Sequence, residues 1–286
     1  MPEQLRSVQR VVTGRQTTDG AGVSLLRVFG YHDTEDFDPF LMLDAFDSST
    51  PEDYVKGFPW HPHRGIETIT YLIEGDVEHG DSLGNRGSIL DGECQWMTAG
   101  SGIIHQEMPQ PTPRLLGCQL WLNLPAKDKM APPAYNDIVR NSVPEIQEPG
   151  ARIRIIAGRY GQKDGAFQGQ YVPLQYLDVQ LQTGATWETE TDTQATVFAY
   201  IVHGQLSFAP EGDYVQQKSA VLLSRGSRVH LQAGENGARL LLLAGRPLKE
   251  PVAWGGSIVM NTEEELKQAY ADLERGSFIR HKAVMD

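Results

Sequence analysis

Short apolar runs, many with apolar and polar side chains in alternation, recur along most of the chain. The runs at residues 68–73 and 196–203 are rich in β-branched and aromatic residues, and a glycine follows each within two positions. Such runs, separated by glycine and proline, indicate β-strands joined by turns. The 286-residue chain has 29 glycines and 17 prolines to form these turns. We therefore expect an all-β protein in which helix is scarce.

The order of strand, turn and strand in the first half of the chain recurs in the second half. Residues 196–204 echo residues 67–75, and residues 222–243 take the place of residues 89–122. A proline-rich, polar stretch without clear periodicity lies between the halves, and this composition is typical of a linker. We therefore expect two antiparallel β-barrels, with an N-terminal domain at residues 1–125, a linker at 126–145 and a C-terminal domain at 146–286.

Two further elements are expected near the ends of the chain. Residues 7–13 and 23–29 should form a hairpin that opens the first barrel. Near the C-terminus, Thr262 and Glu265 form a capping box for a short helix. An apolar stripe then follows at Leu266, Ala269, Tyr270 and Leu273, and Gly276 is a natural stop. We expect this helix to cover a barrel as a structural element.

Charge and composition exclude some classes of function. The formal charge is −12, with 37 acidic and 25 basic residues, whereas direct nucleic-acid binding needs a basic surface. No run of 18 apolar residues and no apolar signal core are present, so neither a membrane partner nor secretion is expected. The two cysteines, Cys94 and Cys118, lie in apolar segments and are expected to be buried thiols in a reducing compartment. We therefore expect a cytoplasmic protein.

The strongest chemical signal is a set of three histidines and a glutamate in two pairs. His61 with His63, and His105 with Glu107, each have a spacing of two residues. A strand directs alternate side chains to one face, so two such strands can bring all four groups to one point. Three imidazoles and a carboxylate suit a first-row metal and leave about two of six octahedral positions open for water, substrate or dioxygen. We expect one divalent transition metal, with Fe(II) first and other metals as alternatives.

Aromatic and polar residues near these pairs have other expected roles. Phe58 and Trp60 fit a pocket wall and a barrel core equally well, whereas core positions are favoured for Trp96 and Met97. His79 and Asp81 lie at a strand end, where hydrogen bonding in a turn is the expected role.

The second half of the chain lacks the corresponding ligands. Residues 188–194 read Glu-Thr-Glu-Thr-Asp-Thr-Gln where a histidine pair should stand, and only His230-Leu-Gln follows later. We therefore expect His203 and His230 to be ordinary strand or turn residues, and the substrate to enter only the first barrel. A fragment that ends near residue 140 is expected to lose solubility or stability before it loses metal affinity.

The motif around the histidines resembles the pirin family of cupins. The matching residues run as Phe58-Pro-x-His61-Pro-His63-Arg-Gly-x-Glu67-Thr, Tyr71-x-x-Glu74-Gly75, and Gly92-x-x-Gln95-Trp96-Met97-Thr98-Ala99-Gly100-x-Gly102-Ile103-x-His105-x-Glu107-Met108-Pro109. This resemblance implies a bicupin, in which each barrel is a double-stranded β-helix, and it places the metal ligands at His61, His63, His105 and Glu107. Some pirins cleave quercetin, while others are metal-bearing regulators that contact proteins.

The first functional hypothesis is a dioxygenase that cleaves a flavonol such as quercetin. A flavonol hydroxyl bound at the metal has a lowered pKa, and Glu107 can take its proton as general base. The resemblance to quercetin dioxygenases implies ring opening and release of carbon monoxide. The alternative is a non-enzymatic, metal-dependent regulatory or redox-sensing protein that binds another protein. A third hypothesis is a zinc or nickel enzyme with isomerase or hydrolase chemistry.

Overall fold

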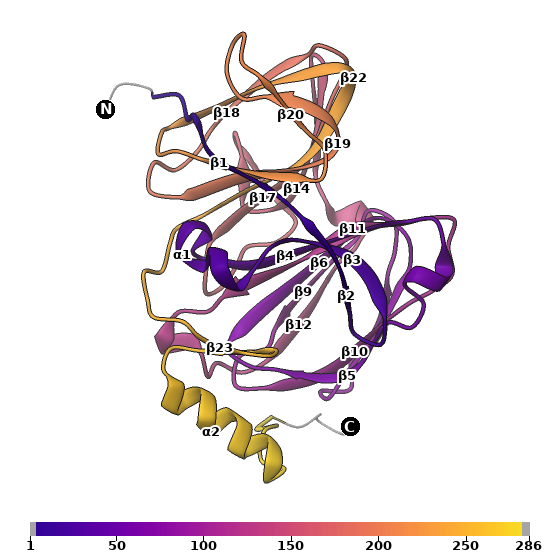
Figure 1. The fold of residues 1–286 in the computed structure, drawn as a ribbon, viewed down its shortest axis with the longest axis vertical. Helices are drawn as coiled ribbons and strands as arrows, with labels where there is room; N and C mark the ends of the chain where they lie inside the picture. The colour runs from indigo at the N-terminus through magenta and orange to yellow at the C-terminus, as the bar shows by residue number, and fades with distance from the viewer. Residues whose placement is uncertain (1–3, 282–286) are drawn as a thin grey trace. The chain divides into compact units, whose positions relative to one another are not determined.

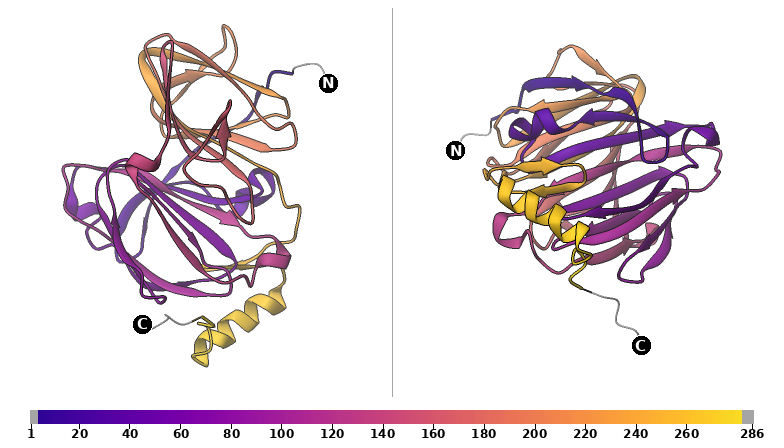
Figure 2. Two further views of the ribbon diagram at one scale, coloured as in Figure 1. Left: turned by 180° about the vertical axis from the view of Figure 1, so that it is seen from behind. Right: turned by 60° about the horizontal axis from the view of Figure 1, so that its bottom comes forward.

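Two compact units, each made of discontinuous segments, form the protein (Figure 1). The computed structural model describes residues 4–281. The N-unit contains residues 15–34, 40–140 and 248–281, and the C-unit contains residues 4–14, 35–39 and 141–247. Views from two further directions show β-strands in both units and little helix (Figure 2). The expectation of an all-β protein is confirmed.

Two sheets and a C-terminal segment build the N-unit. The seven-stranded sheet has the order β12 (Ala134–Ile138), β9 (Cys94–Thr98), β6 (Ile66–Glu74), β11 (Leu115–Asn123), β4 (Phe40–Ser48), β3 (Val23–Phe29) and β2 (Arg15–Asp19). The four-stranded sheet has the order β5 (Phe58–His63), β10 (Ile103–Pro109), β7 (Val77–Asp81) and β8 (Arg86–Ile89). A hairpin of β23 (Ala253–Gly255) and β24 (Ile258–Met260) precedes helix α2 (Glu263–Glu274). Short 3₁₀ helices occur at Tyr31–Asp33, Pro51–Asp53 and Ala126–Asp128.

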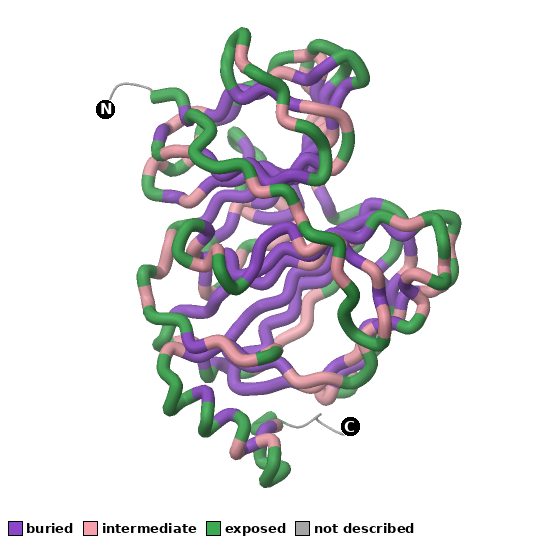
Figure 3. The backbone as a smooth tube through the Cα atoms, in the orientation of Figure 1, coloured by how far each residue is buried: buried purple, intermediate pink, exposed green. Residues whose placement is uncertain are grey.

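The two sheets of the N-unit face each other as a sandwich. One apolar cluster joins Leu25 and Phe46 of the large sheet to Val77 and Ile89 of the small sheet. Figure 3 shows the buried backbone that results along the strands of this unit. Burial of these side chains holds the two sheets together.

One nine-stranded sheet forms most of the C-unit. Its order is β1 (Val8–Thr13), β21 (Ser219–Leu223), β19 (Thr196–Ser207), β22 (Arg228–Gly245), β17 (Leu174–Leu181), β14 (Ala151–Ala157) and β13 (Glu145–Glu148), while β18 (Thr186–Glu190) pairs with β22 and β20 (Tyr214–Gln216) pairs with β19. The short pair of β15 (Arg159–Tyr160) and β16 (Lys163–Asp164), the 3₁₀ helix Arg140–Ser142 and helix α1 (Thr34–Phe37) lie outside this sheet. The inner face of the sheet carries an aliphatic core that includes Ile153, Val197 and Leu240.

The predicted N-terminal hairpin is wrong in its pairing. β1 pairs with β21 of the C-unit, and β3 pairs instead with β2. A tight turn joins β2 and β3. It is possible because Gly20 and Gly22 can adopt the positive φ angles of 57° and 116° that it requires. β1 is then free to cover the otherwise unpaired edge of β21, which protects an exposed strand edge.

The segment expected to be a linker is partly a strand. Residues 134–138 form β12, which pairs with β9 at the edge of the seven-stranded sheet. Proline interrupts the apolar pattern around β12 in the sequence, but the edge of β9 supplies the backbone hydrogen bonds that define a strand. The linear boundaries at residues 125 and 145 remain a prediction, since the compact units are not linear segments.

Helix α2 has the predicted capping box but belongs to the N-unit. The Thr262 hydroxyl accepts a hydrogen bond from the Glu265 amide, and the Glu265 carboxylate accepts one from the Thr262 amide. Leu266 and Ala269 are buried against the β23–β24 hairpin, whereas Tyr270 is 42% exposed. Among the described residues, no helix is long and apolar enough to cross a membrane. Cys94 and Cys118 are buried, as predicted.

Candidate metal centre

Strands β5 and β10 bring the two histidine motifs together. They are antiparallel neighbours, and His105 lies directly opposite His61 in their register, with Ile103 opposite His63. The i, i+2 spacing places His61 and His63 on one face of β5, as the sequence predicted. A register shift follows His105, so that Glu107 pairs with Phe58.

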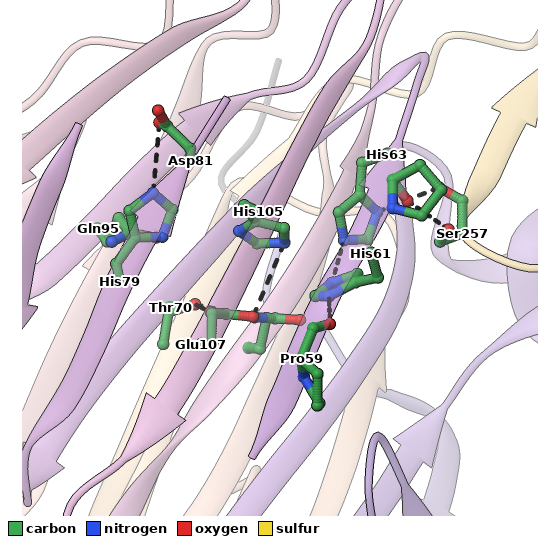
Figure 4. Close-up of polar contacts among 12 residues, drawn as sticks. Pro59, His61, His63, Thr70, His79, Asp81, Gln95, His105, Glu107 and Ser257 are labelled. Carbon is green, nitrogen blue, oxygen red and sulfur yellow. Dashed lines mark hydrogen bonds and ion pairs between the residues drawn. The ribbon is translucent and has the colours of Figure 1, made fainter. Parts of the chain in front are cut away.

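The three histidines form a compact cluster, shown in Figure 4. One ring nitrogen of each residue lies within 4.8 Å of the corresponding nitrogens of the other two. The ring centroids are 4.4 Å apart for His61 and His105 and 5.0 Å apart for His63 and His105. A divalent metal can therefore bind all three nitrogens after small adjustments of the side chains.

Burial holds His63 and His105 in the neutral, metal-binding form. His63 and His105 are 1% and 0% exposed. Burial lowers the pKa of both imidazoles well below the ordinary value of 6.5, and the neighbouring histidines lower it further. An uncharged imidazole keeps a free lone pair, which is the form that coordinates a metal.

Backbone carbonyls fix the orientation of two of the rings. His61 Nδ1 lies 3.0 Å from the Pro59 carbonyl oxygen, and His63 Nδ1 lies 3.1 Å from that of Ser257. A carbonyl oxygen can only accept, so each Nδ1 of a neutral ring carries the hydrogen and each Nε2 is left without one. The two Nε2 atoms nevertheless face each other at 3.0 Å. When both rings are neutral, their lone pairs repel at this distance, and a cation shared by the two nitrogens, either a proton or a metal ion, removes the repulsion.

His105 gives a second, independent indication of a ligand. Both of its ring nitrogens are buried and have no hydrogen-bond partner in the structure. A buried polar group without a partner costs about 1–3 kcal/mol. A metal at His105 Nε2, which faces the other two histidines, would satisfy one of these atoms. The residues present therefore fit a divalent metal.

Glu107 lies beside the cluster but outside the three-nitrogen group. Its Oε2 is 4.0 Å from His105 Nε2, and the residue is 3% exposed. Gln119 Nε2 donates to both carboxylate oxygens at 2.8 and 2.9 Å, and the Thr70 hydroxyl donates to Oε1 at 3.1 Å. These donors from β11 and β6 hold the carboxylate next to His105.

A cavity of about 600 Å³ opens onto the histidines. Its apolar walls come from Met42, Phe46, Phe58 and Trp121, while His61, His63, Glu107 and Gln119 form its polar part. This volume lies within the range of pockets for small organic ligands, about 300–1,000 Å³.

Charged residues also line the cavity. Arg27 donates from Nε and Nη2 to the two oxygens of Asp44 at 2.9 and 2.8 Å, and Nη2 also contacts Asp19 at 2.7 Å. The hydrogen bond to Asp44 raises the pKa of Arg27 above its ordinary value. The guanidinium is therefore fully charged and places a fixed positive charge in the cavity wall, whereas burial raises the pKa of Asp44 and the hydrogen bond from Arg27 opposes this shift.

The structure separates the predicted neighbours of the metal ligands. Phe58 lines the cavity, whereas Trp60 is 52% exposed and does not. Trp96 and Met97 are fully buried core residues, as predicted. Asp81 accepts hydrogen bonds from the amides of Leu83 and Asn85, which confirms its role in a turn.

Sequence reasoning missed the residues that support the ligands from other strands. Gln119, Thr70 and Ser257 carry no motif that connects them to the histidines. The alternation along β11, which places Gln119 and Trp121 on one face, was the available signal for Gln119. Ser257 lies 194 residues after His63, and no local pattern in the sequence could connect the two.

The C-unit histidines lie apart from any such cluster. His230 pairs with Glu188 at 2.9 Å, and His203 is an exposed residue of β19. Within residues 4–281, the histidine, cysteine and acidic side chains give one cluster close enough to hold a metal, the one at His61, His63 and His105.

Glu67 belongs to the histidine motif but points to the opposite face of its strand. Thr70 of the same strand contacts Glu107, and a residue three positions away faces the other side. The Glu67 carboxylate instead accepts a hydrogen bond from the Thr98 hydroxyl at 2.7 Å. Burial raises the pKa of Glu67 to about 7, although the bond from Thr98 opposes this shift.

Glu67 predicts a pH dependence of stability in the metal-free protein. The Glu67 carboxyl ionises near pH 4.5 in the unfolded chain and near pH 7 in the folded protein. The protonated carboxyl therefore makes its full contribution to the free energy of unfolding below pH 4.5, and this contribution is lost as the pH rises to 7. The loss is roughly 3 kcal/mol of unfolding free energy. Glu67→Gln should therefore flatten the pH profile over this interval and be more stable than the wild type at pH 8, as measured by urea unfolding. Glu74→Gln, at the exposed end of the same strand, is the control, and an unchanged profile in Glu67→Gln would contradict the assignment.

Known proteins share this sequence and architecture. The pirin family model matches residues 22–122, and the model of the pirin C-terminal cupin domain matches residues 176–279. A pirin-like protein of Caulobacter vibrioides is 44% identical over 277 residues, covering 96% of this chain and 99% of that protein. The crystal structure of a quercetin 2,3-dioxygenase from Acinetobacter baumannii has a TM-score of 0.88 and 32% identity, covering 96% of this chain and 99% of that one. A bacterial pirin from Escherichia coli in complex with nickel(II) shares the fold, with a TM-score of 0.64, 21% identity and coverage of 83% and 98%.

These similarities extend over both halves of the chain and confirm the bicupin expectation. Neither unit is a barrel closed by continuous strand pairing, because the N-unit has two facing sheets and the single nine-stranded sheet of the C-unit has open edges at β1 and β13. The N-unit carries the histidine cluster that suits a divalent metal. The chain belongs to the pirin family.

Proposed function

We propose that the chain binds one Fe(II) ion through His61, His63, His105 and Glu107 and cleaves a flavonol such as quercetin with dioxygen. The observation that carries the metal site is the convergence of the three histidines, in which His61 Nε2 and His63 Nε2 approach to 3.0 Å and one nitrogen of each ring lies within 4.8 Å of the others. The similarity to a quercetin 2,3-dioxygenase supports the choice of reaction.

The protein groups around the cavity have separate tasks in this proposal. When bound, the metal would act as a Lewis acid that lowers the pKa of a substrate hydroxyl. Glu107 takes the proton released from that hydroxyl, because its carboxylate borders the cavity beside His105. Gln119 and Thr70 keep the carboxylate in position before the substrate arrives.

The cavity walls suit a flat aromatic substrate. Phe46, Phe58 and Trp121 present aromatic surfaces, and the volume of about 600 Å³ admits a molecule of flavonol size. Arg27 and Asp44 lie in the same wall and can bind polar substituents of the substrate. Substrate is thereby oriented in the N-unit alone.

The test is a Glu107→Gln variant loaded anaerobically with iron. Glutamine can still offer an oxygen to the metal but cannot accept the substrate proton, so the variant should keep much of its metal and lose about 10²- to 10⁴-fold in turnover. Elemental analysis gives the metal content, and oxygen uptake with a panel of flavonols gives the turnover. Nickel-loaded protein is measured in parallel, since a pirin has been crystallised with nickel(II).

The matched control is Glu78→Gln, which makes the same change at an exposed position of the neighbouring strand β7. This control should behave as the wild type. Undiminished turnover in Glu107→Gln would exclude the base role. Absence of oxygen uptake by the iron-loaded wild type with every flavonol would exclude the dioxygenase and favour the regulatory hypothesis.

A further inference from the structure

A continuous series of aromatic rings runs from the histidine cluster to the surface of the N-unit. The His63 ring centroid is 5.1 Å from that of Trp121, Trp121 is 5.6 Å from Trp254, and Trp254 is 5.6 Å from Tyr31. The four residues come from β5, β11, β23 and the 3₁₀ helix Tyr31–Asp33.

Exposure rises along this series. His63 is 1% exposed and Trp121 is 8% exposed, whereas Tyr31 at the far end is 60% exposed. The series therefore connects a buried ligand position, through Trp121 in the cavity wall, to a tyrosine exposed to solvent. A tyrosine that remains so exposed gains little from packing, so burial alone does not explain its place at the end.

Hydrogen bonds hold both indole rings in position. The Trp121 indole donates to Gln119 Oε1 at 3.2 Å, and the Trp254 indole donates to the Gly256 carbonyl at 2.8 Å. Trp121 and Trp254 lie at an interplanar angle of 34°. Fixed rings in contact keep the distances between them constant, and a constant short distance is what electron transfer by successive steps requires.

We propose that Trp121, Trp254 and Tyr31 form an electron-transfer path between the metal at His63 and a one-electron carrier at the surface. Indole and phenol rings are among the side chains most readily oxidised by one electron, so a hole can move stepwise along such a series. The path would let the metal change its oxidation state without the carrier entering the cavity. This inference rests on the proposed metal site but not on flavonol cleavage, and it gives the redox-sensing hypothesis a structural basis.

The electron balance of the path is simple. When an oxidant removes one electron from Tyr31, the exposed phenol releases its proton to water. Trp254 then donates an electron to Tyr31, which takes its proton back, and Trp121 donates an electron to Trp254. A reduced metal held by His63 would supply the electron that restores Trp121. The net change is the loss of one electron from the metal and its gain by the oxidant.

Another aromatic pair in the protein is an example of aromatic rings that pack within a core. Tyr160 and Trp187 of the C-unit stack at 5.9 Å. Both are buried, at 8% and 3% exposure, and the Trp187 indole donates to the Tyr160 hydroxyl at 3.0 Å. This pair belongs to the core of its unit and serves as an internal comparison for the path.

The test uses flash oxidation of the full-length protein by photogenerated tris(bipyridine)ruthenium(III), a bulky one-electron oxidant. Metal content is measured first, so that a failure of the metal site is distinguished from a failure of the path. In iron(II)-loaded protein, the tyrosyl radical absorbance should decay quickly while the iron(III) signal appears in electron paramagnetic resonance. In zinc-loaded protein the metal cannot supply an electron, and the radical should persist.

Two variants locate the path. Tyr31→Phe, at an exposed position, should remove the metal-dependent part of the decay, and Trp254→Phe, which keeps an aromatic ring in place, should slow it toward the rate in zinc-loaded protein. Tyr270→Phe, another exposed tyrosine of the N-unit, should have no effect. Equal decay in iron- and zinc-loaded protein, or an unchanged decay in Tyr31→Phe, would overturn the proposal. Trp60 is an exposed indole outside the path. If Trp60→Phe removed the metal-dependent decay, that result would also overturn the proposal.

Discussion

Alanine at both His61 and His105 should leave the protein unable to bind a divalent transition metal with measurable affinity. The double substitution removes two of the three nitrogens that lie within 4.8 Å of one another, and the remaining His63 and Glu107 are too few ligands to hold the metal tightly. The wild type should bind one metal per chain. Elemental analysis after dialysis against a chelator-treated buffer measures both values.

Thermal unfolding gives a second measurement of the same prediction. A ligand that binds only the folded state stabilises it by about 2.7 kcal/mol at a hundred times its dissociation constant. Metal should therefore raise the unfolding temperature of the wild type and not that of the variant. The control is His203→Ala combined with His230→Ala, which changes two histidines of the C-unit and should preserve both stoichiometry and the temperature shift. A second equivalent of metal in the wild type, lost in this control, would contradict the single-site prediction.

The histidine site could be predicted because its determinants are local in the sequence. His61 and His63 share one strand, His105 and Glu107 share another, and the period of a strand alone puts each pair on one face. The capping box at Thr262 and Glu265 is local in the same way, as the hydrogen bonds between these residues confirm. Apolar runs that end at a glycine likewise predicted most strands and the repetition of the strand order in the two halves of the chain.

The residues that orient the ligands could not be predicted, because each acts across strands distant in sequence. Gln119 reaches Glu107 from a different sheet, and Ser257 reaches His63 from the other end of the chain. The pairing of β1 with β21 failed for the same reason, since the partner of a strand depends on which edge is free in the folded protein. Alternation tells which side chains share a face but not what lies opposite that face.

The C-terminal segment, residues 248–281, changes the expectation for a fragment that ends near residue 140. Arg64 is 2% exposed and donates to Asp272 of helix α2 at 2.7 Å and to the Phe278 carbonyl at 3.0 Å. The buried Lys129 donates to the Gly65 and Val259 carbonyls, both at 2.8 Å. These contacts join the segment to the chain that directly follows His63, so the fragment would lack part of the metal site and not only a covering domain.

Truncation after residue 247 should therefore lower metal affinity as well as stability. The His63 ring would lose the Ser257 carbonyl that orients it, and loss of such an outer partner typically costs about 10- to 100-fold in metal affinity.

A full-length Asp272→Ala variant isolates the ion pair between Arg64 and Asp272. Arg64 stays buried without its carboxylate partner, and the free energy of unfolding should fall by about 3–5 kcal/mol. Urea unfolding and metal titration by calorimetry measure the two effects, with Glu264→Ala, an exposed change on the same helix, as the control. A truncated protein that folds and binds metal as tightly as the full chain would show that the segment covers the site without shaping it.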